Sequence, residues 1–426
     1  MQRPFGLWTA ASMVVGSMIG AGIFVLPSSL GQFGWTVAVG WVVAGAGVLV
    51  IARLIAELHV RYPKEPSALT ISGDILGLLA VRLIAWSYWF GILVAATFLA
   101  LAAADYLVFL FPDVRSDDGL KPVIATVILA SLVIINLRGV KGAGKFQVAT
   151  TALKLFPLAI VIAIVAYLAF AVPETYTASQ SEPFRASLLT PALGATFFAV
   201  LGFEAASLVA QRVRDPERNV VRATLFGVLF VLIIYFLVST GIVLATPADE
   251  LHGASAPVAA FASTHAGSWA GNVVALFAVI SAIGCLNAIL LLLGEVPFGM
   301  ARDGQLPDWV APGSDSGVGR RPLIVAAVIA ATVVLMSSNA FGAQVFDFLL
   351  RLTVAANIWF YAGICLAALK DGAKPILAVL GLAFCGWVLY GSGTEASIMG
   401  ISLMLVGAIL HFMIGGRTKP RGSAPA

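Results

Sequence analysis

The sequence predicts an all-α integral membrane protein with about twelve transmembrane helices. Hydrophobic residues make up 60% of the 426 residues and charged residues only 11%, and the mean hydropathy is +1.00. A soluble core of this length does not require so apolar a composition. The apolar stretches are continuous and lack the alternating pattern of a membrane β-barrel, so we expect helices.

The expected spans each contain roughly 20 apolar residues, the length that crosses about 30 Å of hydrocarbon. They follow one another closely, and no separate soluble domain fits in the remaining loops. They lie at 7–33, 35–57, 78–111, 121–137, 146–171, 190–211, 222–246, 270–299, 322–340, 343–368, 374–391 and 394–415.

The first span contains helix-weakening residues in the stretch "VVGSMIGAGIFVLP" at 14–27. A Gly16-x-x-x-Gly20 pattern is common where two membrane helices pack closely. The sixth span, however, reads "FFAVLGFEAAS" and carries Gly202 next to bulky residues. Interrupted helices in the first and sixth positions, at matching places in two blocks of five spans, are typical of a transporter built from inverted repeats with its site at mid-membrane.

An interrupted membrane helix has a specific binding chemistry. The break frees N–H groups that lipid cannot satisfy, and the half-helix that begins there presents the positive end of its dipole, which suits a carboxylate. The half-helix that ends there leaves carbonyl groups that suit an ammonium group. Glycine lets a ligand approach the backbone. A molecule that carries both groups is an α-amino acid.

The basic residues predict the orientation of the chain in the cell membrane. With a cytoplasmic N-terminus, about 20 of the 25 basic residues fall on the cytoplasmic side, and an even number of spans then puts both termini there. The net charge of +4 reflects this topology and does not indicate a nucleic-acid partner. The main clusters lie at 138–145, 212–222 and 417–421.

The sequence does not indicate an enzyme, and we expect no metal or cofactor. The four histidines are scattered over loops and span ends. No Ser/His/Asp grouping or H-E-x-x-H pattern is present. The cysteines Cys285, Cys365 and Cys385 lie within spans and are expected to be small buried hydrophobic residues.

Three stretches together resemble the amino acid–polyamine–organocation transporters. They are "GSMIGAGIFVLP" (16–27), "FFAVLGFEAASLVAQRVRDPERNVVRA" (197–223) and "MARDGQLPDW" (300–309), and the likeness covers nearly the whole chain. It implies a leucine-transporter-like fold of two five-helix inverted repeats plus two peripheral helices. The expected boundaries are 1–171 and 190–368 for the repeats, 374–415 for the peripheral spans and 416–426 for a cytoplasmic tail.

The resemblance also implies an activity. It is secondary transport of an amino acid across the cytoplasmic membrane by alternating access, driven by proton coupling or by exchange. Some members of the family, the arginine exchangers, form dimers, so a homodimer is a further expectation.

The resemblance assigns backbone groups at the two breaks to the substrate. Ala21, Gly22 and Ile23 match positions whose amides receive the carboxylate, and Met18 matches a carbonyl that receives the ammonium; Gly20 belongs to the same break. Relatives often have Ser at the position of Ala21, so a hydroxyl contact is lost here.

In the second break, beside Gly202, Phe198 and Leu201 match carbonyl positions. Phe198 also stands where the arginine exchangers carry a stacking Trp, which makes arginine a less expected substrate.

The selectivity of the site is expected to come from the third, eighth and tenth spans. The best candidates are Ile92 and Ala96 on the third and Asn287 and Ile289 on the eighth, with ordinary helix packing as an equal alternative for each. An apolar wall without a spare carboxylate favours a neutral, hydrophobic amino acid. The alternative is an antiporter of cationic amino acids or polyamines; a channel or a membrane sensor is less favoured.

Two charged residues within spans are candidates for coupling or gating. Glu204 is either a proton-sensitive gate or a structural acceptor for the amides that the break frees. Lys154, in "TALKLFPL", either extends back to the interface or matches the lysine that occupies an ion position in proton-coupled relatives. In the second case, proton gain and loss at Lys154 would couple transport to protons without sodium.

Overall fold

The computed structural model describes residues 6–63, 65, 67–111, 119–137, 143–179, 181–204, 213–302, 306–310, 319–336 and 342–414. The expected tail at 416–426 lies outside these residues, as do parts of the expected basic clusters at 138–145 and 212–222. The second half of the expected sixth span, from 205 onwards, is also outside them.

The described elements are helices almost throughout. The first half of the chain forms α1 Leu7–Met18, α2 Gly22–Leu30, α3 Thr36–Arg61, α4 Ala68–Leu76, α5 Leu78–Phe109, α6 Leu120–Leu137, α7 Ala143–Ala171, α8 Glu174–Ala178 and α9 Ala186–Ala199. The second half forms α11 Pro216–Tyr235, the π-helical segment η4 Phe236–Thr240, α12 Gly241–Ala245, α13 Ala248–Leu251, α14 Pro257–Ala266, α15 Ser268–Arg302, α16 Arg320–Met336, α17 Gly342–Lys370, α18 Pro375–Gly391 and α19 Thr394–Ile414.

Most of the expected spans meet the length that a membrane crossing requires. Eight helices in the described part of the chain are long and apolar enough, and α1 together with α2 and its following turn makes a ninth, bent by 43°. Helices α9, α16 and α18 are shorter, with 14, 17 and 17 residues. These three occupy the sixth, ninth and eleventh expected spans.

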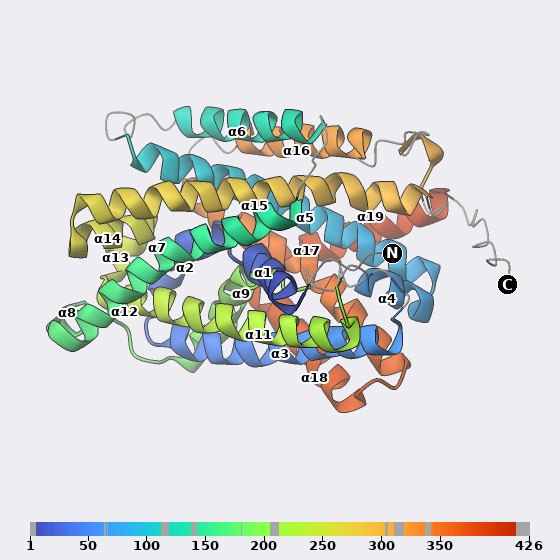
Figure 1. Ribbon diagram of the computed structural model, residues 1–426, viewed down its shortest axis with the longest axis horizontal. Helices are drawn as coiled ribbons and strands as arrows, with labels where there is room; N and C mark the ends of the chain where they lie inside the picture. The colour runs from blue at the N-terminus through green and yellow to red at the C-terminus, as the bar shows by residue number, and fades with distance from the viewer. Residues whose placement is uncertain are drawn as a thin grey trace.

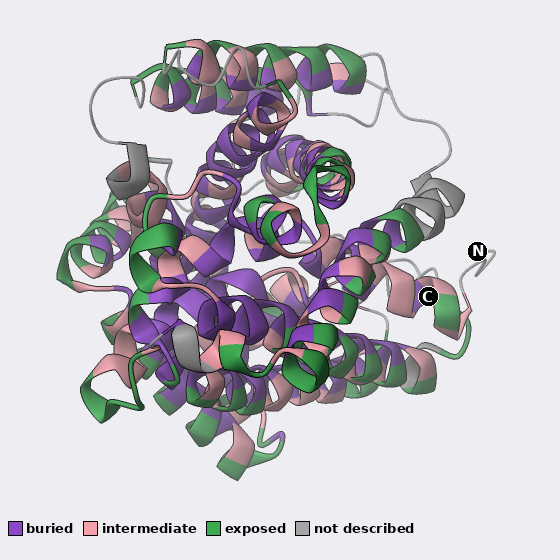
Figure 2. Ribbon diagram, turned by 90° about the vertical axis from the view of Figure 1, so that its left-hand side faces the viewer, coloured by how far each residue is buried: buried purple, intermediate pink, exposed green. Residues whose placement is uncertain are grey.

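The long helices run roughly along one common direction, with α4 at one end of the bundle and α8, α13 and α14 at the other (Figure 1). Buried residues lie on the inner faces of the helices and exposed residues around the outside (Figure 2). Helices α5 and α17 are central, since 78% of each membrane-crossing window is buried, whereas only 17% is buried for the peripheral α19.

The first expected interruption is present, and at the second the described helix ends as expected. Helix α1 ends at Met18 and α2 begins at Gly22. Helix α9 ends at Ala199, and the turn that follows contains Gly202 with a φ of +99°. An L side chain rarely adopts that conformation, so this turn requires glycine.

Candidate functional site

The two interrupted helices meet across a cavity of about 370 Å³. The Ser17 hydroxyl donates to the Gly202 carbonyl at 2.8 Å, which links the first break to the second. The cavity extends from the breaks along the N-terminal part of α1, at Met13, and along the C-terminal part of α15, at Glu295. It therefore extends toward the end of the bundle that carries α4.

The structure brings most of the sequence-predicted site residues to this cavity. Those that line it are Met18, Gly20, Gly22, Ile92, Lys154, Phe198, Leu201, Gly202, Glu204 and Ile289. Those that do not are Ala21, Ile23, Ala96 and Asn287.

The start of α2 supplies amide donors at the cavity. An α-helix cannot satisfy the amides of its first turn, and within the described part of the chain no side chain caps α2 at Ala21. Gly22 is the first residue of the helix and lines the cavity. A Cβ atom at Gly22 would stand 3.3 Å from the Phe198 ring, so glycine keeps this approach open. The arrangement suits an anionic group such as a carboxylate.

The carbonyl groups of the first break are bound by side chains from three other elements. Lys154 Nζ donates to the Gly16 carbonyl at 2.7 Å. The Tyr235 hydroxyl donates to the Met18 carbonyl at 2.8 Å, and the Ser281 hydroxyl donates to the Gly20 carbonyl at 3.2 Å.

The Met18 carbonyl, expected to bind the substrate ammonium, also accepts from the Gly20 amide at 3.0 Å, so it already has two donors. Sequence reasoning missed Tyr235 and Ser281, because nothing local to either residue points to the first span.

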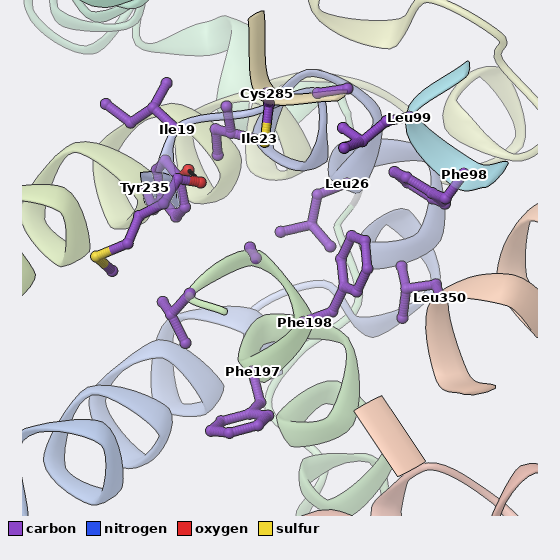
Figure 3. Packing of buried hydrophobic residues seen from close by; sticks show 14 of the residues in the cluster. Ile19, Ile23, Leu26, Phe98, Leu99, Phe197, Phe198, Tyr235, Cys285 and Leu350 are labelled. Atoms are coloured by element: carbon purple, nitrogen blue, oxygen red, sulfur yellow. Dashed lines mark hydrogen bonds between the residues drawn. The ribbon is translucent and has the colours of Figure 1, made fainter. Parts of the chain in front are cut away.

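An aromatic cluster includes Phe198, which lines the cavity. The Phe98 ring lies 4.7 Å from the ring of Phe198, edge to face (Figure 3). It also lies 4.5 Å from the ring of Phe346, again edge to face. The three residues come from α5, α9 and α17. Edge-to-face contacts of this kind are favourable and specific in geometry. The sequence had indicated only Phe198.

Glu204 is buried and accepts hydrogen bonds on both carboxylate oxygens. The Tyr88 hydroxyl donates to Oε1 at 3.1 Å and the Tyr361 hydroxyl donates to Oε2 at 2.7 Å. Both tyrosines line the cavity. Glu204 thus links the second break to α5 and α17, and these partners were not apparent from the sequence.

Lys154 is 3% exposed and does not extend to the interface. Its amine donates to Gly16 within the first helix, and its side chain lies beside Gly284 and Cys285 on α15. A lysine in this position contacts both the first broken helix and the cavity.

Two predicted wall residues lie outside the lining of the cavity. On α5, residues 92, 95 and 99 line it, at the i, i+3 and i+7 spacing of one helix face. Ala96 lies four residues after Ile92, near the same face, but it is fully buried and is not part of the lining. On α15, Asn287 lies outside the lining, and its side-chain oxygen accepts from Asn136 on α6 at 2.8 Å.

The wall of the cavity contains a carboxylate, Glu295, where the sequence had predicted apolar residues. Glu295 lies on α15 and lines the cavity. Its position in the sequence, near the end of a long apolar helix, did not distinguish it from a residue at the interface.

Comparison with known proteins identifies the family of this chain and several of its relatives. The model of the amino acid permease family matches residues 5–414. A putative arginine/ornithine antiporter of Bacillus subtilis strain 168 is 26% identical, covering 99% of both chains. A cadaverine/lysine antiporter of Escherichia coli K12 is 25% identical over 92% of this chain and 90% of that protein. An arginine/ornithine antiporter of Pseudomonas aeruginosa is 26% identical over 95% and 89%.

A solved structure supports the fold. The crystal structure of MhsT in complex with L-phenylalanine superposes with a TM-score of 0.59 over 96% of this chain and all of that chain, at 16% identity. The predicted leucine-transporter-like fold is thereby confirmed.

Proposed function

Because the chain belongs to the amino acid permease family, we propose that this amino acid transporter is an antiporter that prefers substrates with a cationic side chain. Such a carrier exchanges one amino acid for a related amino acid or amine across the membrane. The observation that carries the proposal is Glu295, a carboxylate on the wall of the cavity between the two broken helices.

The first step is recognition of the part that all amino acids share. The amides at the start of α2, around Gly22, bind the α-carboxylate, since they lack helical partners and lie at the positive end of the helix. The carbonyl groups of Phe198 and Leu201 at the second break face the α-ammonium. One break thus binds the carboxylate and the other binds the ammonium, which is why both breaks lie at the same cavity.

The second step is recognition of the side chain. A cation that leaves water needs a carboxylate partner, and Glu295 offers one. The relatives named as arginine/ornithine and cadaverine/lysine antiporters support the same substrate class.

A second candidate is a transporter of neutral, hydrophobic amino acids. Ile92, Ile289 and Phe198 line the cavity, and they make much of its wall apolar. A leucine or methionine side chain against this wall would need no charged partner.

Transport by either candidate would be coupled through Lys154. Its amine binds Gly16 in the first broken helix, so loss or gain of a proton there changes a contact of the element that binds substrate. This assignment implies that transport is coupled to protons and does not require sodium.

Counterflow in liposomes tests the proposal. Vesicles loaded with lysine, arginine, leucine or methionine are supplied with the same labelled amino acids outside. We expect exchange of lysine or arginine, and in Glu295→Gln a loss of about tenfold in their affinity relative to leucine. Glu395→Gln, an exposed carboxylate at the start of α19, is the matched control.

The outcomes separate the candidates. Exchange restricted to leucine or methionine would support the second candidate and reject the first. An ohmic current without any exchange would reject transport altogether.

A further inference from the structure

A second cavity of about 180 Å³ lies between α5, α15, α16 and α19, apart from the transport cavity. Its lining is almost entirely apolar and includes Trp86, Trp89 and Trp309. The indole of Trp86 donates to the Leu403 carbonyl and that of Trp89 to the Leu293 carbonyl, both at 2.9 Å. The walls are therefore fixed by hydrogen bonds between helices.

The cavity contains one buried cation, Arg82, which is 5% exposed. Its Nη1 donates to Nδ1 of His411 at 3.0 Å, and its Nε and Nη2 have no hydrogen-bond partner among the residues that the structure describes. No acidic residue is among the described residues that line the cavity. A guanidinium carries its charge at all relevant pH values, and a buried charge without a counter-ion is unfavourable.

The cavity lies near one end of the bundle and opens toward the lipid-facing surface. Arg82 is four residues from the start of α5, about 6 Å along the helix axis. Val325 on α16 lines the cavity and is 46% exposed. Exposed apolar residues continue along the neighbouring helices, at Val328 on α16 and Ile409 on α19.

We propose that this cavity binds the phosphate group of an anionic phospholipid. The unpaired Nε–H and Nη2–H lie on one edge of the guanidinium and can donate to two phosphate oxygens at once. Tryptophan is enriched at the level of the lipid head groups in membrane proteins. Three tryptophans line this cavity. Basic pockets between membrane helices bind anionic head groups by the same chemistry.

The size of the cavity fits one head group. Pockets for drug-sized ligands measure about 300–1,000 Å³, so 180 Å³ holds the phosphate and its nearest atoms only. The acyl chains then lie outside, along the exposed apolar residues of α16 and α19. A free inorganic phosphate would gain nothing from these apolar walls, and we therefore assign the site to a lipid.

Thermal unfolding of the protein in detergent tests the proposal, since a ligand that binds only the folded state raises its Tm. The probes are phosphatidylglycerol, phosphatidylcholine and inorganic phosphate. We expect phosphatidylglycerol to raise Tm at concentrations about tenfold lower than phosphatidylcholine. In Arg82→Gln this preference should disappear.

The control variant is Arg185→Gln, which removes the same charge from an exposed site in the segment before α9. It should keep the preference for phosphatidylglycerol. If it loses the preference as Arg82→Gln does, the effect is bulk electrostatics and the proposal is wrong. The proposal is also wrong if inorganic phosphate stabilises as well as phosphatidylglycerol, or if Arg82→Gln retains the preference.

A second variant covers the case in which Arg82→Gln does not fold. Val325→Trp keeps the cation but fills the mouth of the cavity with a larger side chain. We expect the preference for phosphatidylglycerol to fall about tenfold. An unchanged preference in a folded Val325→Trp protein would place lipid binding elsewhere and overturn the assignment.

Discussion

The hydroxyl of Ser17 in the first interrupted helix donates a hydrogen bond to the carbonyl of Gly202 in the second, at 2.8 Å. The two residues are 185 positions apart in the chain. A Cβ atom at Gly202 would stand 3.0 Å from the Ser17 carbonyl oxygen, so the two backbones approach closely only because residue 202 is glycine. The contact joins the two elements that are expected to hold the substrate.

Ser17→Ala should lower the stability of the protein by about 0.5–1.5 kcal/mol, because it removes the part-buried hydrogen bond to the Gly202 carbonyl. Tm from intrinsic tryptophan fluorescence measures the effect. Ser28→Ala is the control, since the Ser28 hydroxyl donates to Val25 within its own helix and its loss should cost less. Equal losses of stability in the two variants would show that the hydrogen bond between the two breaks contributes no more than one within a helix.

Gly22→Val should abolish substrate binding and leave membrane insertion intact. A Cβ atom at Gly22 would stand 3.3 Å from the Phe198 ring, and the branched side chain would cover the amides at the start of α2. Binding is measured by substrate-induced thermal shift. Gly386→Val on α18 is the control, because open space surrounds that position and binding should persist. Normal affinity in a well-inserted Gly22→Val protein would show that this glycine serves packing only.

Lys154→Ala should retain exchange but lose its response to a proton gradient. The variant removes the titratable amine that binds Gly16 in the first broken helix. Uptake into sodium-free vesicles with an inward proton gradient measures this, and the wild type should accumulate substrate there. Lys370→Ala, at the exposed end of α17, is the matched lysine control and should behave as the wild type does. A sodium requirement in the wild type, or an unaltered gradient response in Lys154→Ala, would exclude Lys154 as the coupling group.

Tyr235→Phe should destabilise the folded protein by about 0.5–1.5 kcal/mol, since the Met18 carbonyl loses one of its two donors and keeps the Gly20 amide. Tm again reports the change. Tyr167→Phe provides the comparison, because Tyr167 is 60% exposed and its hydroxyl should contribute little. A smaller loss in Tyr235→Phe than in Tyr167→Phe would contradict the role assigned to this hydrogen bond.

The sequence by itself determined the fold class, the helix interruptions and the family. Long apolar runs must form helices in lipid, because no other single segment satisfies its own backbone there. The two breaks were visible because glycine and proline act on the backbone of their own segment. Gly22 and Gly202 could therefore be named from local sequence, and Phe198 from the resemblance of its stretch; all three line the cavity.

Only the tertiary structure decided which face of each helix meets the cavity. Apolar side chains cover both the lipid-facing and the inward faces of these helices, so no amphipathic pattern marks the inner face. For this reason Asn287 was chosen on α15, where Glu295 lines the cavity. The same reason hid the contact of Arg82 with His411, 329 residues apart. A helix rotates by about 100° per residue, and only packing against its neighbours fixes that angle.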